Sequence, residues 1–272
     1  MFNFCQYDYR IHNISSYYEY CHKELKPVLY QLQKEDNYGL NLKDYSQFIK
    51  NNSINNAVII NPNNPNGSYI NRSEIIEFLD EHTDLDSIIL DESFIHFAYE
   101  NSNMMLETLQ SSIDKYKNLF IVKSMSKDFG IAGLRCGYVL MNDKNVSNFL
   151  NNGYLWNIND IAEYFFNLYG NEEFLLKYED CRKKYITETL FFLNQLKELK
   201  NINVLPSKAN FVLVELLNGL KSEDVSLNLL INHGVYVRNC SDKVGLEGEY
   251  IRIAARSFDE NQQIFNALKE IK

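Results

Sequence analysis

The sequence lacks features that mark several classes of protein. None of its apolar runs approaches the roughly 20 residues needed to cross a bilayer, so we expect no membrane partner. Its 27 Lys and Arg are outnumbered by 36 Asp and Glu, which gives a net charge of -9 and a pI near 5.1. Binding along a phosphate backbone needs a basic face, and we therefore expect no nucleic-acid partner.

Cysteine is scarce and scattered. The five cysteines lie at positions 5, 21, 136, 181 and 240, and no two of them form a CxxC pair. An odd number of cysteines without metal-ligand spacing favours reduced thiols and predicts no metal site. The N-terminus also lacks the basic start and apolar stretch of a secretory signal. We therefore expect a cytoplasmic protein.

The patterns that are present predict two domains. In the first half, short apolar runs without alternation predict buried strands at 57–61, 87–93, 118–124 and 136–141, and a helix over 71–82 begins at Asn71 or Ser73. The fold class predicted for residues 1–170 is α/β, with a mixed, mainly parallel sheet flanked by helices. The second half predicts a long helix over 158 to about 200, strands at 209–216, 234–240 and 250–256, and helices over 221–232 and from Asp259. Residues 171–272 are therefore predicted to form a smaller α+β domain.

Polar side chains follow the predicted strands of the first half. The stretch NPNNPNG, residues 61–67, follows the apolar run AVII and predicts a tight turn. Each residue of this kind has an ordinary explanation by itself, as a turn former, a cap or a solvated charge. Open α/β sheets bind ligands beyond the carboxyl ends of their strands, so we expect these side chains to meet in one crevice: Asn64, Asp91, Ser124, Ser126, Lys127 and Arg135.

Three ordered motifs together resemble the large fold family of pyridoxal-phosphate-dependent aminotransferases, class I and II. NPNNPNG matches the family pattern NPxNPxG, DESF matches DExF/Y, and SMSKDFGIAGLRCGY matches SxSKxxGxxGxRxGY. The resemblance runs from about residue 15 to the C-terminus, and histidinol-phosphate aminotransferase and threonine-phosphate decarboxylase are the most similar members. It implies pyridoxal 5'-phosphate as cofactor, a small-molecule amino acid or amino phosphate and a 2-oxo acid as partners, and a homodimer.

The resemblance also assigns roles. Lys127 supplies the amine that binds the cofactor's aldehyde and later moves a proton. Asp91 keeps the ring nitrogen protonated. Asn64 donates to the ring's phenolic oxygen, and the phosphate is held by Arg135 with Ser124 and Ser126.

Further roles follow from weaker matches. SSYYEY places Tyr17 to stack on the cofactor ring, with core packing as its alternative, and YIRIAAR makes Arg252 the candidate for gripping the substrate carboxylate. Arg256 is predicted to form a structural ion pair. Arg238 either helps to bind a substrate phosphate or is a solvated arginine of an edge strand. Two residues near the motifs are expected to pack or to lie at the surface: His96 and Cys240.

Two departures from the family pattern matter. Phe94 stands where many members have a tyrosine that donates to the cofactor, and it either faces the ring or packs in the core. The N-terminal part of the pattern, which includes a helix start that binds the phosphate, has no match. We expect a fragment, a natural truncation or a chain completed by another polypeptide, and weak cofactor binding by this chain alone.

The first function predicted is that of an aminotransferase in amino-acid biosynthesis, which moves an amino group between an amino acid or amino phosphate and a 2-oxo acid. The alternatives are a decarboxylase of amino-acid phosphates, favoured by Phe94 and the C-terminal resemblance, and a truncated, non-catalytic binding or scaffold subunit.

Overall fold

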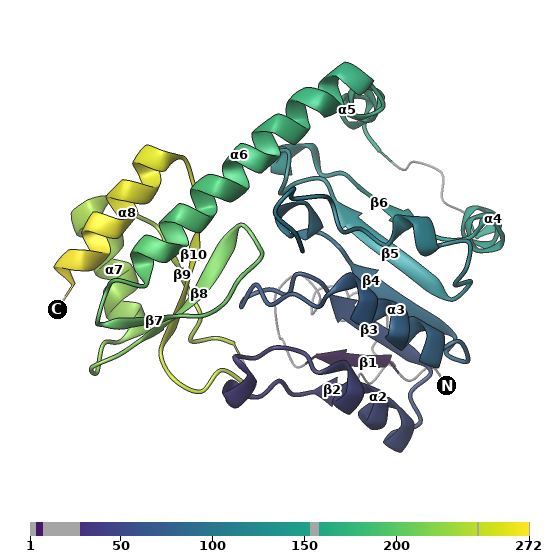
Figure 1. Cartoon of the computed structure of the whole chain (residues 1–272), viewed down its shortest axis with the longest axis horizontal. Helices are drawn as coiled ribbons and strands as arrows, with labels where there is room; N and C mark the ends of the chain where they lie inside the picture. The colour runs from purple at the N-terminus through teal and green to yellow at the C-terminus, as the bar shows by residue number, and fades with distance from the viewer. Residues whose placement is uncertain (1–3, 8–27, 153–157, 244, 272) are drawn as a thin grey trace.

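The first sheet carries the predicted motifs. The computed structural model describes residues 4–7, 28–152, 158–243 and 245–271. Six strands form this sheet in the order β2-β1-β3-β4-β5-β6, and all neighbours are parallel except the antiparallel pair β5 and β6 (Figure 1). The strands are β1 (Phe4–Tyr7), β2 (Val28–Tyr30), β3 (Asn56–Ile60), β4 (Ser87–Asp91), β5 (Leu119–Ser124) and β6 (Gly137–Leu140). This arrangement confirms the predicted mixed, mainly parallel sheet.

Helices α2 (Leu42–Asn51), α3 (Arg72–Glu81) and α4 (Asp143–Asn151) accompany this sheet. Every residue of β3 is buried, which explains why its sequence shows no alternation. Helix α3 begins after Asn71 and buries Ile75, Phe78 and Leu79, whose spacing places them on one face. These side chains pack in one apolar cluster with residues of β3 and β4. The predicted cap at Asn71 is thereby confirmed.

The second sheet has four antiparallel strands in the order β7-β8-β10-β9. They are β7 (Ile202–Val204), β8 (Phe211–Leu216), β9 (Arg238–Asn239) and β10 (Tyr250–Ala254). Helices α6 (Glu172–Leu196), α7 (Ser222–His233) and α8 (Phe258–Glu270) lie beside it and share an apolar cluster with β8 and β10 (Figure 1). This is the smaller α+β unit that the sequence predicts.

Two predicted elements differ from the structure. The helix expected over 158 to about 200 is broken, because α5 (Asp160–Tyr169) ends before Gly170 and Asn171 starts α6 by accepting the N–H of Phe174 at 3.0 Å. The strand expected over 234–240 is reduced to β9, because Gly234 ends α7 with a left-handed φ of 65°. The domain boundary predicted near residue 170 stays a prediction.

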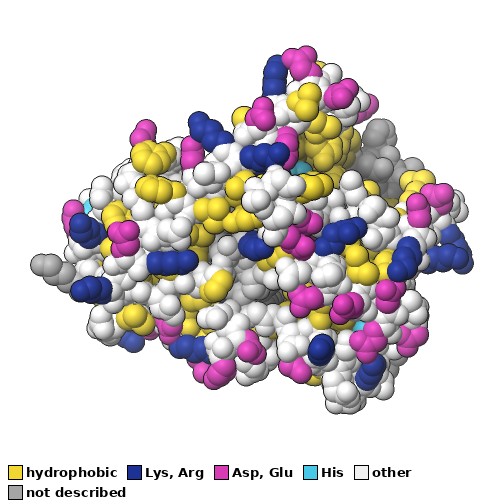
Figure 2. Space-filling view, viewed as in Figure 1, with side chains coloured by type: hydrophobic (Ala, Val, Ile, Leu, Met, Phe, Trp, Pro, Cys, Tyr) yellow, Lys and Arg dark blue, Asp and Glu magenta, His cyan; other side chains and the backbone are white. Residues whose placement is uncertain are grey.

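Surface and helix composition add two observations. On the face drawn in Figure 2, basic and acidic side chains are interspersed and no broad basic field is seen. Within the described ranges, no helix combines the length and the apolar character that crossing a membrane requires.

Candidate active site

The candidate site lies at the carboxyl edge of three parallel strands. In the register of the sheet, Ile60 at the end of β3 is paired with Asp91 at the end of β4, which is paired in turn with Val122 of β5. Asn64 follows β3 within one turn, and Ser124 ends β5. The structure therefore brings the residues that follow β3, β4 and β5 to one edge, which is where open α/β sheets bind ligands.

The turn after β3 is fixed by its own asparagines. The side-chain Nδ2 of Asn61 donates to the carbonyl of Ile70 at 2.9 Å, and its Oδ1 accepts the N–H of Ile70 at 2.8 Å. The backbone N–H of Asn61 donates to the carbonyl of Asp91 at 2.9 Å, so the turn is also tied to β4. Asn64 is buried within this turn. Asn and Pro thus hold residues 61–67 in a fixed turn rather than a loose surface loop, and we call this turn the platform.

Gly67 joins this platform to the second unit. Its φ is 73°, and a Cβ built on it would lie 1.9 Å from Oγ of Ser207. Its carbonyl accepts the N–H of Lys208 at 2.8 Å. Only glycine allows both this backbone conformation and this close approach, so the glycine of the turn motif is explained by contact between the two units.

Arg252 reaches the platform from β10. Its Nη1 donates to Oδ1 of Asn64 at 2.5 Å, and its guanidinium lies 5.0 Å from the ring centroid of Phe211. None of the ion pairs among the described residues includes Arg252. The guanidinium therefore has donors left for an anionic ligand in the crevice.

Lys127 lies in the turn after β5, and its side chain is exposed. Its Nζ is 5.9 Å from the ring centroid of Phe94. Partial burial, and after it the positive charges of Arg252 and Arg135, lower the pKa of the Lys127 amine. A lower pKa increases the neutral fraction of the amine, which is the form that attacks a carbonyl.

Asp91 offers a carboxylate at the end of β4. Its Oδ1 accepts the N–H of Ser93 at 2.8 Å. Burial raises the pKa of Asp91, and the hydrogen bonds from Ser93 and the charge of Lys123 oppose that rise. Across the part of the chain that the structure describes, no ion pair includes Asp91. A protonated ring nitrogen is the kind of partner that would stabilise this carboxylate.

Donors suited to a phosphate lie around the turn after β5. Oγ of Ser124 accepts the N–H of Ser126 at 3.3 Å, so the hydroxyl of Ser124 lies beside the backbone of Ser126. Arg135 is exposed, has a left-handed φ of 53°, and donates to the carbonyl of Ala132 at 3.1 Å. The structure does not bring Arg135 into contact with the serines, although its charge acts on Lys127. Together these groups fit a cofactor with an aldehyde, a ring nitrogen and a phosphate.

The remaining predicted residues have mixed outcomes. Phe94 is buried and packs edge-on against Phe211 with ring centroids 5.0 Å apart, so the core alternative is favoured and its contact with a cofactor stays a prediction. Tyr17 lies outside the described residues. Arg256 forms the expected ion pair, with Glu260, at 2.9 Å. Two residues are buried, which confirms packing and excludes a surface position: His96 and Cys240.

Arg238, which the sequence offers either as a phosphate contact or as a solvated edge-strand arginine, lies on β9 directly opposite Arg252 in the register of the second sheet, and it is only half-buried. Two further charged residues were not recognised as important from the sequence. Lys123 and Asp128 form a buried ion pair next to Lys127. A charged residue inside the apolar run NLFIVKS was the one available signal for Lys123.

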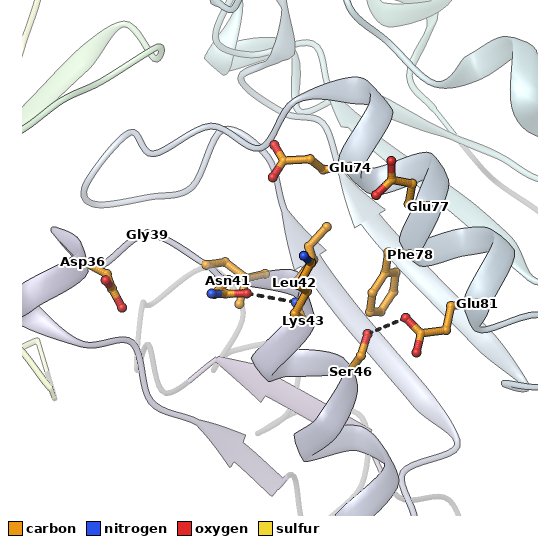
Figure 3. A pocket seen from close by; sticks show the side chains of 11 residues that line it. Asp36, Gly39, Asn41, Leu42, Lys43, Ser46, Glu74, Glu77, Phe78 and Glu81 are labelled. Atoms are coloured by element: carbon orange, nitrogen blue, oxygen red, sulfur yellow. Dashed lines mark hydrogen bonds between the residues drawn. The ribbon is translucent and has the colours of Figure 1, made fainter.

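A separate hollow of about 560 Å³ lies between α2 and α3 (Figure 3). Its walls carry Glu74, Glu77 and Glu81 from α3 and Lys43 from α2. The excess of carboxylates would repel a phosphate, so this hollow is not the cofactor site. Another hollow, of about 460 Å³, has Lys127 in its wall.

The comparisons with known proteins agree with the motifs. A family profile described as "Aminotransferase class I and II" matches residues 13–269. The chain is 46% identical over 261 residues to L-serine phosphate decarboxylase of Campylobacter jejuni, covering 96% of this chain and 67% of that protein. It is 32% identical over 250 residues to histidinol-phosphate aminotransferase of Methanococcus aeolicus, covering 86% of this chain and 64% of that protein. A solved decarboxylase from Sulfurospirillum multivorans superimposes with a TM-score of 0.92 at 43% identity, over 98% of this chain and 75% of that one.

Proposed function

Because the chain belongs to the class I and II aminotransferase family, whose cofactor is pyridoxal phosphate, we propose that it removes the carboxyl group of a phosphorylated amino acid, L-serine phosphate or a close analogue. Support comes first from similarity. Relatives named as L-serine phosphate decarboxylases are 46% and 45% identical to this chain, whereas a relative named as an aminotransferase is 32% identical.

The observation that carries the proposal is the pair of arginines on neighbouring strands. Arg238 and Arg252 are direct cross-strand partners, and like charges placed opposite one another destabilise a sheet. Asp242 neutralises Arg238 at 2.5 Å, while Arg252 has no ion-pair partner among the described residues and donates to the amide oxygen of Asn64. A phosphate carries between one and two negative charges near neutral pH and matches two guanidinium groups better than a single carboxylate does. The pair therefore favours a phosphorylated substrate.

Phosphate binding at this pair also favours loss of the carboxyl group. A carboxylate bound to arginine is stabilised in the ground state, and that stabilisation is lost as carbon dioxide leaves without charge. If the arginines hold the substrate phosphate instead, the carboxylate is not stabilised in this way, and the barrier to its loss is not raised. This assignment changes the role of Arg252 from the carboxylate contact that the sequence suggests to a phosphate contact.

The residues of the edge have matching roles. When bound, pyridoxal phosphate supplies an electron sink for the bond that breaks at the substrate Cα. Asp91 would hold the proton on the ring nitrogen, Asn64 would orient the ring oxygen, and Ser124, Ser126 and Arg135 would bind the phosphate of the cofactor. The amine of Lys127 would pass a proton taken up from solvent to Cα in place of the departing carboxyl group, so that the products are carbon dioxide and the corresponding amine.

Transamination remains the second candidate, because relatives named as histidinol-phosphate aminotransferases match most of the chain. A non-catalytic role is disfavoured, because Asn64, Asp91, Lys127 and Arg135 are all present. The homodimer stays a prediction.

The test is to incubate the protein with pyridoxal phosphate and L-serine phosphate in the absence of any 2-oxo acid. We expect release of carbon dioxide, and little or none from L-serine, which lacks the phosphate. Arg238→Gln should reduce the rate with L-serine phosphate, and Arg72→Gln, which changes an exposed contact with Ser111, should not. Amino transfer that occurs only after a 2-oxo acid is added would overturn the proposal.

A further inference from the structure

A buried cluster of ionisable groups includes Asp128, the residue that follows Lys127. Oδ2 of Asp128 is 3.0 Å from Nζ of Lys123 and 3.0 Å from Nδ1 of His96. The exposed fractions of these side chains are 1% for Asp128, 2% for Lys123 and 4% for His96. Nδ1 of His96 also lies 2.6 Å from the hydroxyl of Tyr178 on α6. The cluster thus joins β5, the turn after β5 and α6.

The stability of the fold alone does not explain why the charged side chains of Lys123 and Asp128 are buried. Desolvation of two charges offsets much of their mutual attraction, and apolar residues of similar size at such positions are often at least as stable. Neither Oδ1 nor Oδ2 of Asp128 has a well-aligned hydrogen-bond partner within the described part of the chain, so the carboxylate is compensated mainly by the charge of Lys123. A costly and incompletely satisfied pair beside an active site is a candidate for a role in the site itself.

The turn after β5 places this pair where it can act on Lys127. The side chain of Lys127 is exposed, whereas that of the next residue, Asp128, is almost completely buried. Phe129 follows, and its ring stacks on Tyr178 with centroids 4.3 Å apart. The buried side chain of Asp128 and the stacked ring of Phe129 therefore anchor the backbone that carries Lys127.

We propose that Asp128, held by the charge of Lys123, is a positioning residue that directs the amine of Lys127 toward the aldehyde of the cofactor. The proposal rests on the assignment of Lys127 as the cofactor lysine. Asp128 touches neither substrate nor cofactor in this account. It acts through the backbone of the turn, and Lys123 acts through Asp128. Burial lowers the pKa of His96 to about 2, so His96 packs against Asp128 as a neutral ring whose hydrogen-bond partner is Tyr178.

The charges around Lys123 determine which variants are informative. Glu92 and Asp91 attract Lys123 in addition to Asp128, and Arg182 donates to the carbonyl of His96 at 2.9 Å. Asp128→Asn would leave Lys123 with only the carboxylates of Asp91 and Glu92 nearby, and this change could disturb the fold. The double variant Lys123→Met with Asp128→Asn removes both charges and avoids an unpaired buried cation.

The experiment compares the affinity of each variant for pyridoxal phosphate and for pyridoxamine phosphate. Pyridoxamine phosphate has the same ring and phosphate but no aldehyde, so it cannot bond to Lys127. In the native protein, the aldehyde form should bind more tightly by the contribution of that bond. We expect Asp128→Asn and the double variant to weaken binding of pyridoxal phosphate about 10- to 100-fold, the range typical of a misplaced reacting group, with pyridoxamine phosphate affected about twofold or less.

Lys127→Ala serves as the reference, because it should abolish the preference for the aldehyde form entirely. A native preference retained by both Asp128 variants would overturn the positioning role and leave the assignment of Lys127 intact. Equal weakening for both ligands would also overturn it, because a general disturbance of the pocket would explain that result. A preference for the aldehyde form retained by Lys127→Ala would show instead that Lys127 is not the cofactor lysine. The assignment of Lys127 and the positioning role of Asp128 would then both be wrong.

Discussion

Arg252 donates to Asn64 across the junction of the two sheets, with Nη1 2.5 Å from Oδ1. Arg252 belongs to β10, and Asn64 belongs to the turn that follows β3. We propose that Arg252 binds the phosphate of the substrate and that Asn64 orients the ring of the cofactor. Under this proposal, the contact links the residue that would hold the substrate to the residue that would orient the cofactor.

The Arg252 contact leads to the first prediction. Arg252→Lys keeps the positive charge but loses the planar fork of donors. Losing a charge-assisted hydrogen bond costs about 1.5–3 kcal/mol, which corresponds to a decrease in kcat/KM of about 10- to 100-fold. Steady-state kinetics with L-serine phosphate measure this effect. Arg72→Lys, in an exposed contact with Ser111, is the matched control, and similar losses in both variants would contradict the assignment.

The second prediction concerns the covalent lysine. Borohydride reduction of the protein mixed with pyridoxal phosphate should attach the cofactor to Lys127, because its amine has a lowered pKa and lies in the turn after β5. Lys127→Ala should remove the labelled peptide seen by mass spectrometry. The exposed Lys117 provides a control, since Lys117→Ala should leave the labelling unchanged. A label that persists on another lysine after Lys127→Ala would show that the site is misassigned.

Asp91 gives the third prediction. Asp91→Asn replaces the carboxylate by a neutral amide, which cannot keep the ring nitrogen protonated. A lost charge-assisted bond lowers cofactor affinity by about 1.5–3 kcal/mol, whereas turnover should fall by far more, because the electron sink itself depends on that proton. Cofactor titration and turnover at saturating cofactor separate the two effects. Normal turnover would remove Asp91 from the mechanism.

The fourth prediction tests the junction at Gly67. Gly67→Ala puts a side chain at a left-handed φ, which costs about 1–2 kcal/mol, and it also forces the new Cβ against Ser207, where overpacking typically costs about 1–3 kcal/mol. Urea unfolding should therefore show a marked loss of stability. Ser207→Gly by itself removes the hydrogen bonds of the Ser207 hydroxyl with Phe211 and Ala209, so it serves as the reference. Relative to Ser207→Gly, adding Gly67→Ala should cost only the first part, and no further loss would mean that the backbone conformation carries no strain.

The fifth prediction concerns acid stability. Hydrogen bonds from the backbone and hydroxyl of Ser222, followed by that of Lys221, lower the pKa of Glu249 to about 2, from an ordinary value of 4.5. A carboxyl group whose pKa is lower in the folded state adds stability above its unfolded pKa, and this stability is lost as pH falls through the folded pKa. Between about pH 4.5 and pH 2, the native protein should therefore lose more stability than Glu249→Gln. Urea unfolding over this range is the measurement, with the exposed Glu198→Gln as control, and parallel pH profiles for all three proteins would refute the role of Glu249.

The sequence predicts the sheet edge well and the contacts between the two units poorly. Asn64, Asp91 and Lys127 could be found because each follows an apolar run, and parallel strands bring such positions together. The opposition of Arg238 and Arg252 could not be found, because it depends on the register of β9 and β10 and on the left-handed Gly234 that shortens β9. Register in a hairpin is fixed by the hydrophobic pattern and by the type of turn, and the connection from Asn239 of β9 to Tyr250 of β10 is too long for a turn type to be recognised from the sequence.

The buried charges were missed for a related reason. Lys123 is a lysine at the end of an apolar strand, where a solvated side chain is the usual outcome. Its burial depends on Asp128, five residues later, and on His96 from another segment. The break between α5 and α6 was missed because apolar periodicity continues on both sides of Gly170, and the cap at Asn171 decides where the second helix begins.

The most direct test of the central claim follows the carboxyl carbon of the substrate. L-serine phosphate labelled with carbon-13 at that carbon is incubated with the protein and pyridoxal phosphate, without a 2-oxo acid, and the products are followed by nuclear magnetic resonance. Our account predicts that the label leaves as carbon dioxide and bicarbonate in equal amount to the ethanolamine phosphate formed. Label retained in a three-carbon 2-oxo product, formed only when a 2-oxo acid is added, would contradict it and identify a transaminase.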